Sequence, residues 1–139
     1  MESRIIKFEP LNDQSRLNMS HKVGDLELSF EKLIGTFGEP NFGSDGYKTD
    51  VEWGIEFDDG TIASIYNYKN GRNYNGEYGL DVEDISHWSI GGFDDKSYNK
   101  VMDAVCDYLY ISAKYGHGKT ELDIEFEEMT KDFKTIYLG

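Results

Sequence analysis

Basic residues, cysteine and long apolar runs are scarce or absent in this sequence, and each shortage excludes a class of protein. Fourteen Lys and Arg stand against 27 Asp and Glu, so the formal charge is −13. A surface of that sign repels phosphates, and the composition therefore argues against direct binding to nucleic acid. It favours a basic protein partner, or solubility alone.

The cysteine count and the hydropathy bound the compartment. The one cysteine, Cys106, excludes an internal disulfide and suits a reducing cytosol. Its place beside an apolar stripe predicts a buried structural thiol. No apolar run approaches the ~20 residues of a membrane span, and the first ten residues lack the apolar core of a secretion signal. We therefore expect a soluble intracellular protein that does not engage a membrane.

The remaining composition is typical of a folded chain. Of the 139 residues, 38% are hydrophobic and 14% aromatic. This content excludes a disordered chain and is enough for a single core. We expect one globular domain over residues 1–139.

Residues 48–69 give the clearest predicted element, a β-hairpin. Asp59-Gly60 is a dipeptide typical of two-residue hairpin turns. Counting outward from this turn gives four cross-strand pairs: Phe57 with Ile62, Ile55 with Ser64, Trp53 with Tyr66, and Val51 with Tyr68. Side chains alternate between the faces of a strand, so this register predicts that all eight share one apolar face.

The flanking segments predict an α+β fold, with an antiparallel sheet built around the central hairpin and packed against one long and one short helix. Ser29 is a candidate N-cap for the short helix over residues 30–37, which Gly38 ends. The long helix begins at Asp94 or Ser97 and runs to about Lys114. Extended segments are predicted at 4–8, 23–28, 85–90 and 121–128, and a loop at 70–84.

The residue patterns of catalytic and metal sites are missing. His21, His87 and His117 have no nucleophile or acid at motif spacing. The sequence has no cysteine pair, no histidines at i,i+4 spacing and no EF-hand loop. We therefore expect a protein that is not an enzyme and that has no catalytic residues, metal or cofactor.

One candidate site is a group of aromatic and basic residues near the open end of the hairpin. Tyrosine and tryptophan offer stacking surfaces, and neighbouring lysine and arginine offer charge to a phosphate, so the group predicts a nucleotide-like ligand. The alternative is that the rings are core and the lysines solvated. The predicted ligand-binding residues are Tyr47, Lys48, Trp53, Tyr66, Asn67, Tyr68, Lys69, Arg72 and Trp88.

A second candidate is the acidic segment 121–128. Carboxylates two residues apart on one strand face lie roughly 7 Å apart, comparable to the spacing of phosphates along a DNA strand. Such a row predicts a DNA-mimic-like inhibitor of a basic host protein, for example a CRISPR or restriction nuclease. An acidic edge strand that prevents aggregation is the alternative. The residues concerned are Glu121, Asp123, Glu125, Glu127 and Glu128.

The string FGEPNFGSDGYKTDVEW, followed by FDDGTIASIYNYKNG and HWSIGG, resembles a family of small bacteriophage-encoded proteins. Their shared pattern is FGEP…DGYK…EW…F-DG…IYNYK-G…W-IGG, and it covers roughly residues 37–92, about two fifths of the chain. The resemblance carries no activity with it, but it implies a phage origin. Small phage proteins often block a host enzyme or sequester an immune signal, so the expected role is counter-defence by stoichiometric binding in the host cytoplasm. The oligomeric state is left open.

Overall fold

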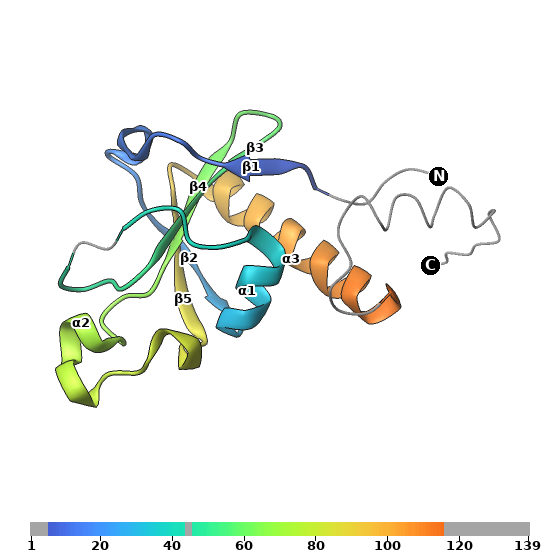
Figure 1. Ribbon diagram of the computed structural model, residues 1–139. Helices are drawn as coiled ribbons and strands as arrows, with labels where there is room; N and C mark the ends of the chain where they lie inside the picture. Colours follow the sequence, from blue (N-terminus) through green and yellow to red (C-terminus); the bar gives the residue numbers. More distant parts are fainter. Residues whose placement is uncertain (1–5, 44–45, 116–139) are drawn as a thin grey trace, which may run out of the picture.

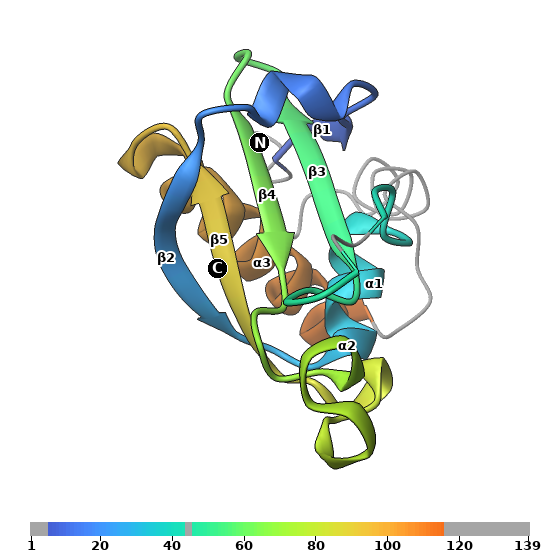
Figure 2. The ribbon, with the colours of Figure 1, turned by 90° about the vertical axis from the view of Figure 1, so that its left-hand side faces the viewer.

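The computed structural model describes residues 6–43 and 46–115 as a five-stranded antiparallel sheet with helices on one face (Figure 1). The strand order is β1-β3-β4-β5-β2. Two helices, α1 and α3, cover one face, and the opposite face is turned to the viewer in Figure 2. The predicted α+β class is confirmed. The strands are β1 Phe8–Pro10, β2 His21–Glu27, β3 Glu52–Phe57, β4 Ile62–Tyr66 and β5 His87–Gly92.

The β3–β4 hairpin lies inside the sheet as predicted, but its register differs from the predicted one by one residue. Gly54 pairs with Ser64 and Glu52 with Tyr66. The turn has three residues, because Phe57 N–H donates to the Thr61 carbonyl at 2.8 Å and Gly60 adopts a φ of 91°. A third turn residue in the left-handed region is a common hairpin solution.

Because of this shift, the β3 residue and the β4 residue of each predicted pair within the strands lie on opposite faces of the sheet. Trp53, Ile55 and Phe57 point toward the helices, together with Ala63 and Ile65. Ile62, Ser64 and Tyr66 lie on the open face instead, beside Glu52 and Glu56. The predicted face of eight residues is therefore wrong for β4.

The helices follow their sequence signals closely. In α1, Phe30–Phe37, the Ser29 hydroxyl accepts a hydrogen bond from Lys32 N–H at 3.2 Å, and Gly38 follows with a φ of 86°. The long helix α3 spans Asp95–Tyr115. Cys106 lies on the exposed side of α3, so the predicted burial of its thiol is wrong. None of the helices in residues 6–43 and 46–115 has the length and apolarity that crossing a membrane requires.

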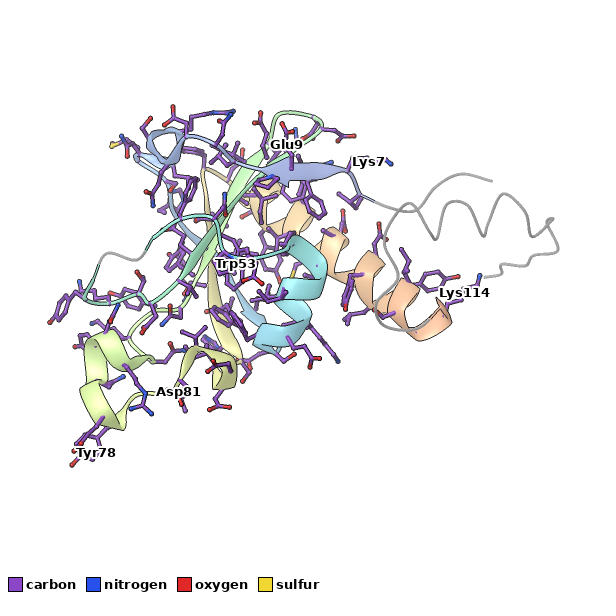
Figure 3. The ribbon with its side chains drawn as sticks, in the orientation of Figure 1. Lys7, Glu9, Trp53, Tyr78, Asp81 and Lys114 are labelled. Carbon is purple, nitrogen blue, oxygen red and sulfur yellow. The ribbon has the colours of Figure 1, made fainter. Side chains whose placement is uncertain are left out.

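Two tryptophans occupy the centre of the core between the sheet and the helices. Trp53, labelled in Figure 3, and Trp88 contact each other edge to face at 5.4 Å between ring centroids. Each indole N–H donates to a backbone carbonyl at 2.8 Å, from Trp53 to Gly38 and from Trp88 to Leu28. These bonds satisfy the polar edge of each buried ring and fix the chain around α1.

The predicted loop 70–84 contains short helical turns. They are α2 Arg72–Asn75, η2 Gly76–Tyr78 and η3 Val82–Asp84. One more turn, η1 Gln14–Leu17, crosses one end of the open sheet face (Figure 2). The predicted strand at 121–128 lies outside the described residues.

Candidate functional site

Three tyrosines and two lysines gather on the surface where the chain enters β3 and leaves β4. We call Tyr47, Lys48, Tyr68, Lys69 and Tyr74 the tyrosine–lysine cluster. The rings of Tyr47 and Tyr74 contact each other at 5.3 Å between centroids. Lys69 Nζ lies 5.2 Å from the Tyr68 ring centre and 5.3 Å from that of Tyr74, and Lys48 Nζ lies 6.0 Å from that of Tyr68.

The three rings of the cluster remain accessible. The exposed fractions are 56% for Tyr47, 48% for Tyr68 and 38% for Tyr74. Each ring therefore keeps surface on which another flat group can stack, and the two ammonium groups lie among the rings. The formal charge of the protein is −13, so acidic residues outnumber basic ones. Two lysines beside three aromatic rings therefore form a group that differs in charge from the protein as a whole.

The backbone joins the two halves of the cluster directly. Lys69 N–H donates to the Lys48 carbonyl at 2.8 Å, and the Asn75 side chain donates to the Lys69 carbonyl at 2.9 Å. Lys69 adopts a φ of 64°, in the left-handed region. A non-glycine residue there is strained, and the surrounding contacts hold it in place.

Asn67 is buried beneath the cluster, and its hydrogen bonds join the segments that carry the cluster. Its side chain is 0% exposed and makes four hydrogen bonds. The side-chain carbonyl accepts from the backbone N–H groups of Asp50 and Val51, and the amide donates to the side-chain oxygens of Asp50 and Asn70. Asn67 therefore positions the site, and its predicted contact with a ligand does not fit this burial.

Two of the predicted ligand residues are core. Trp53 is 1% exposed and Trp88 is 0% exposed, and both face the helices. Their aromatic faces are covered by Phe30 and by each other. Neither ring has surface left for a ligand, so the alternative that these rings are core is the one that holds.

Arg72 and Tyr66 make their described contacts with residues outside the tyrosine–lysine cluster. Arg72 Nε donates to the Asp81 carboxylate at 2.6 Å, which compensates its charge within the 70–84 segment. Tyr66 lies on the open sheet face, where burial raises the pKa of its phenol, followed by the negative charge of Glu52. Tyr74, which no sequence pattern singled out, takes the place of these residues in the cluster.

The open sheet face carries a polar hollow next to Tyr66. It is about 460 Å³ in volume and lies between η1 and strands β3, β4 and β5. Sequence reasoning missed it because the one-residue register error placed Ser64 and Tyr66 on the helix side. The hollow is lined by Gln14, Ser15, Leu17, Asn18, Ser20, His21, Thr49, Glu52, Ser64, Tyr66 and Gly91.

The second predicted site is beyond the described part of the chain. Glu121, Asp123, Glu125, Glu127 and Glu128 all belong to segment 116–139, so their arrangement is not described. Within residues 6–43 and 46–115, no three histidine, cysteine or acidic side chains come together as a metal site would require.

Comparisons with known proteins give no family for this chain. No family model matches it, and no curated protein matches it significantly in sequence. The resemblance of residues 37–92 to phage proteins therefore stays a prediction from the sequence pattern.

Proposed function

We propose that the protein is a non-catalytic, phage-type counter-defence protein that sequesters a nucleotide-like signal molecule by stoichiometric binding. The tyrosine–lysine cluster supports the binding, and the sequence pattern of residues 37–92 supports the phage origin. Withholding such a signal in the host cytoplasm would inhibit host antiviral immunity without any chemical step.

The cluster contains the two kinds of group that a nucleotide needs. An ammonium pairs with phosphate oxygens, and a tyrosine ring stacks on a base. An exposed cation–π contact contributes about 0.5–1 kcal/mol, whereas a hydrogen bond to a charged group contributes about 1.5–3 kcal/mol. A phosphate therefore competes well with the rings for Lys48 and Lys69, and the rings are then left to hold the base.

The backbone of Lys69 gives a second reason. Glycine occupies a positive φ without the steric cost that a side chain imposes there. Among the described non-glycine residues, only Met19 and Lys69 have positive φ. Lysine at this position costs stability, and it puts an ammonium between the Tyr68 and Tyr74 rings. Binding of an anion by that ammonium accounts for a residue that the fold itself disfavours.

The test is capture of the ligand from an extract of phage-infected cells. The purified protein is incubated with the extract, washed and denatured, and the released small molecules are identified by mass spectrometry. We expect a phosphate-bearing, base-containing molecule at close to one equivalent per site. Lys48→Ala and Lys69→Ala should lose capture without a lower melting temperature.

Two results would contradict the proposal. One is catalytic turnover of the captured molecule. The other is an extract from which nothing small is released while a basic host protein co-purifies through residues 121–128. The second result would support the DNA-mimic-like alternative, and its binding should weaken steeply with ionic strength, because exposed charge pairs are screened by salt.

A further inference from the structure

Ser64 and Gly91 both line the polar hollow on the open sheet face. These two residues pair across β4 and β5. A Cβ at Gly91 would lie 2.5 Å from Ser64 Oγ and 3.3 Å from Tyr66 Cε1. The Ser64 hydroxyl and the edge of the Tyr66 ring therefore pack directly against Gly91, in the space that a side chain at this position would take.

The Ser64 hydroxyl is buried and makes no hydrogen bond within the described part of the chain. Ser64 is 3% exposed, and no other group in residues 6–43 and 46–115 makes a hydrogen bond with its side chain. A buried hydroxyl in that condition costs free energy, and a group that enters the hollow with its own hydroxyl removes the cost. Ser64 is thus a polar side chain that lines a cavity and has an unmet hydrogen-bonding capacity.

The walls of the hollow determine which chemistry fits. Glu52 supplies carboxylate oxygens, which only accept hydrogen bonds, and Tyr66 supplies a phenol directly across from it in the sheet. No lysine or arginine is among the described residues that line the hollow. The Glu52 carboxylate, which accepts a hydrogen bond from Gln14 Nε2 at 3.3 Å, would repel a phosphate, whereas a sugar ring offers hydroxyls that donate to a carboxylate. Acidic side chains hold ribose hydroxyls in this way in dinucleotide sites.

The hollow continues toward the tyrosine–lysine cluster. Thr49 lines the hollow and follows Lys48 in the chain, and Tyr66 lines it two residues before Tyr68. Residues two apart along an extended chain are about 7 Å apart.

We infer that the polar hollow binds the sugar ring of the nucleotide-like ligand, with Ser64 and Glu52 hydrogen-bonded to its hydroxyls. This inference rests on the proposed function, in which Lys48 and Lys69 hold the phosphate. The hollow makes the site selective for phosphates that carry a sugar over phosphates that do not.

The test compares Ser64→Ala with Ser89→Ala in calorimetric titrations with adenosine monophosphate and with pyrophosphate. Ser89 is a matched control because it is 4% exposed, lies on the adjacent strand and pairs with Tyr66, but does not line the hollow. We expect Ser64→Ala to weaken adenosine monophosphate binding about threefold to tenfold, the effect of one neutral hydrogen bond. Pyrophosphate binding should not change, and Ser89→Ala should leave both probes unaffected. The melting temperature of Ser64→Ala should not fall, because the removed hydroxyl makes no hydrogen bond with any residue in 6–43 and 46–115.

The failures of the two proposals are distinguishable. If adenosine monophosphate binds the wild type, Lys69→Ala weakens it and Ser64→Ala does not, the sugar site is overturned and the proposed function stands. Equal weakening by Ser64→Ala and Ser89→Ala would also overturn it. If neither probe binds the wild type at millimolar concentration, the phosphate site fails and the inference fails with it.

Discussion

The side-chain carbonyl of Asn67 accepts a hydrogen bond from Asp50 N–H at 2.7 Å, and the amide of the same side chain donates to the Asp50 carboxylate at 2.9 Å. The other carboxylate oxygen of Asp50 accepts from Asn73 N–H at 3.2 Å. The pair therefore joins the segment before β3, the end of β4 and the start of α2. These three segments supply Tyr47 and Lys48, Tyr68 and Lys69, and Tyr74.

Replacing Asn67 with alanine should lower the free energy of unfolding by about 2–4 kcal/mol. The change leaves the N–H groups of Asp50 and Val51 without their acceptor, and each buried unsatisfied group costs about 1–3 kcal/mol. Urea titration measures the loss. Asn99→Ala is the control, because Asn99 is exposed on α3 and should change stability by less than about 0.5 kcal/mol. Equal effects of the two variants would contradict the stabilising role of the Asn67 hydrogen bonds.

Replacing Gly60 with alanine tests the three-residue turn. The φ of Gly60 is 91°, and a Cβ there would meet no atom within 4 Å, so the cost is conformational and not steric contact. We expect a loss of about 1 kcal/mol and a melting temperature lower by a few degrees. Gly43→Ala is the control, since Gly43 is equally uncrowded and lacks a positive φ. A Gly60 variant as stable as the Gly43 variant would contradict the turn geometry.

The turn also shows why the sequence predicted the hairpin but not its register. The Asp59-Gly60 dipeptide fits a two-residue turn and a three-residue turn equally well, and only the φ of Gly60 and the Phe57–Thr61 pairing distinguish them. Strand β4 carries apolar residues on both faces: Ile62 packs beneath η1 with Leu11 and Leu17 on the open face, and Ala63 and Ile65 face the helices. Polarity alternation was therefore too weak on β4 to correct the error.

Local signals predicted local structure well. The Ser29 cap and Gly38 end of α1 are contacts within a few residues, and both are confirmed. The members of the tyrosine–lysine cluster are brought together by Asn67 and by the turn of α2, neither of which has a short-range signature. The sequence gives no signal for Tyr74 for that reason. It predicts ligand binding by Trp53 and Trp88 because the residue type alone does not show whether an aromatic ring is buried or exposed.

The imidazole of His87 should titrate above its ordinary range. Its hydrogen bond with the Glu27 carboxylate raises the pKa, and the charge of Asp25 adds to the effect, while Lys22 is paired with Asp25 at 2.7 Å. A raised pKa in the folded state stabilises below the unfolded value near 6.5 and is lost as the pH rises through the folded pKa. Glu27→Gln should lower the pKa of His87 in an NMR titration, and its stability difference from the wild type should shrink between pH 6 and 8. A wild-type value at or below 6.5 would contradict this account.

Cys106 should react with a thiol reagent in the native protein. The thiol is exposed on α3, so labelling does not require unfolding. Without denaturant, Ellman's reagent should modify one thiol per chain at a rate close to that of an exposed model thiol. A reaction that proceeds only in denaturant would restore the burial predicted from the apolar stripe.

The most direct test of ligand binding by the tyrosine–lysine cluster is the amount of small molecule that Lys69→Gly retains from a phage-infected extract, relative to Lys32→Ala. Both variants remove one exposed positive charge, and Lys32 lies on α1. Glycine also relieves the positive φ at position 69, so stability should stay equal or rise while binding falls. We predict that Lys32→Ala retains the wild-type amount and that Lys69→Gly retains tenfold to a hundredfold less, the effect of one lost charge-assisted contact. Equal retention by the two variants would contradict the role of the cluster.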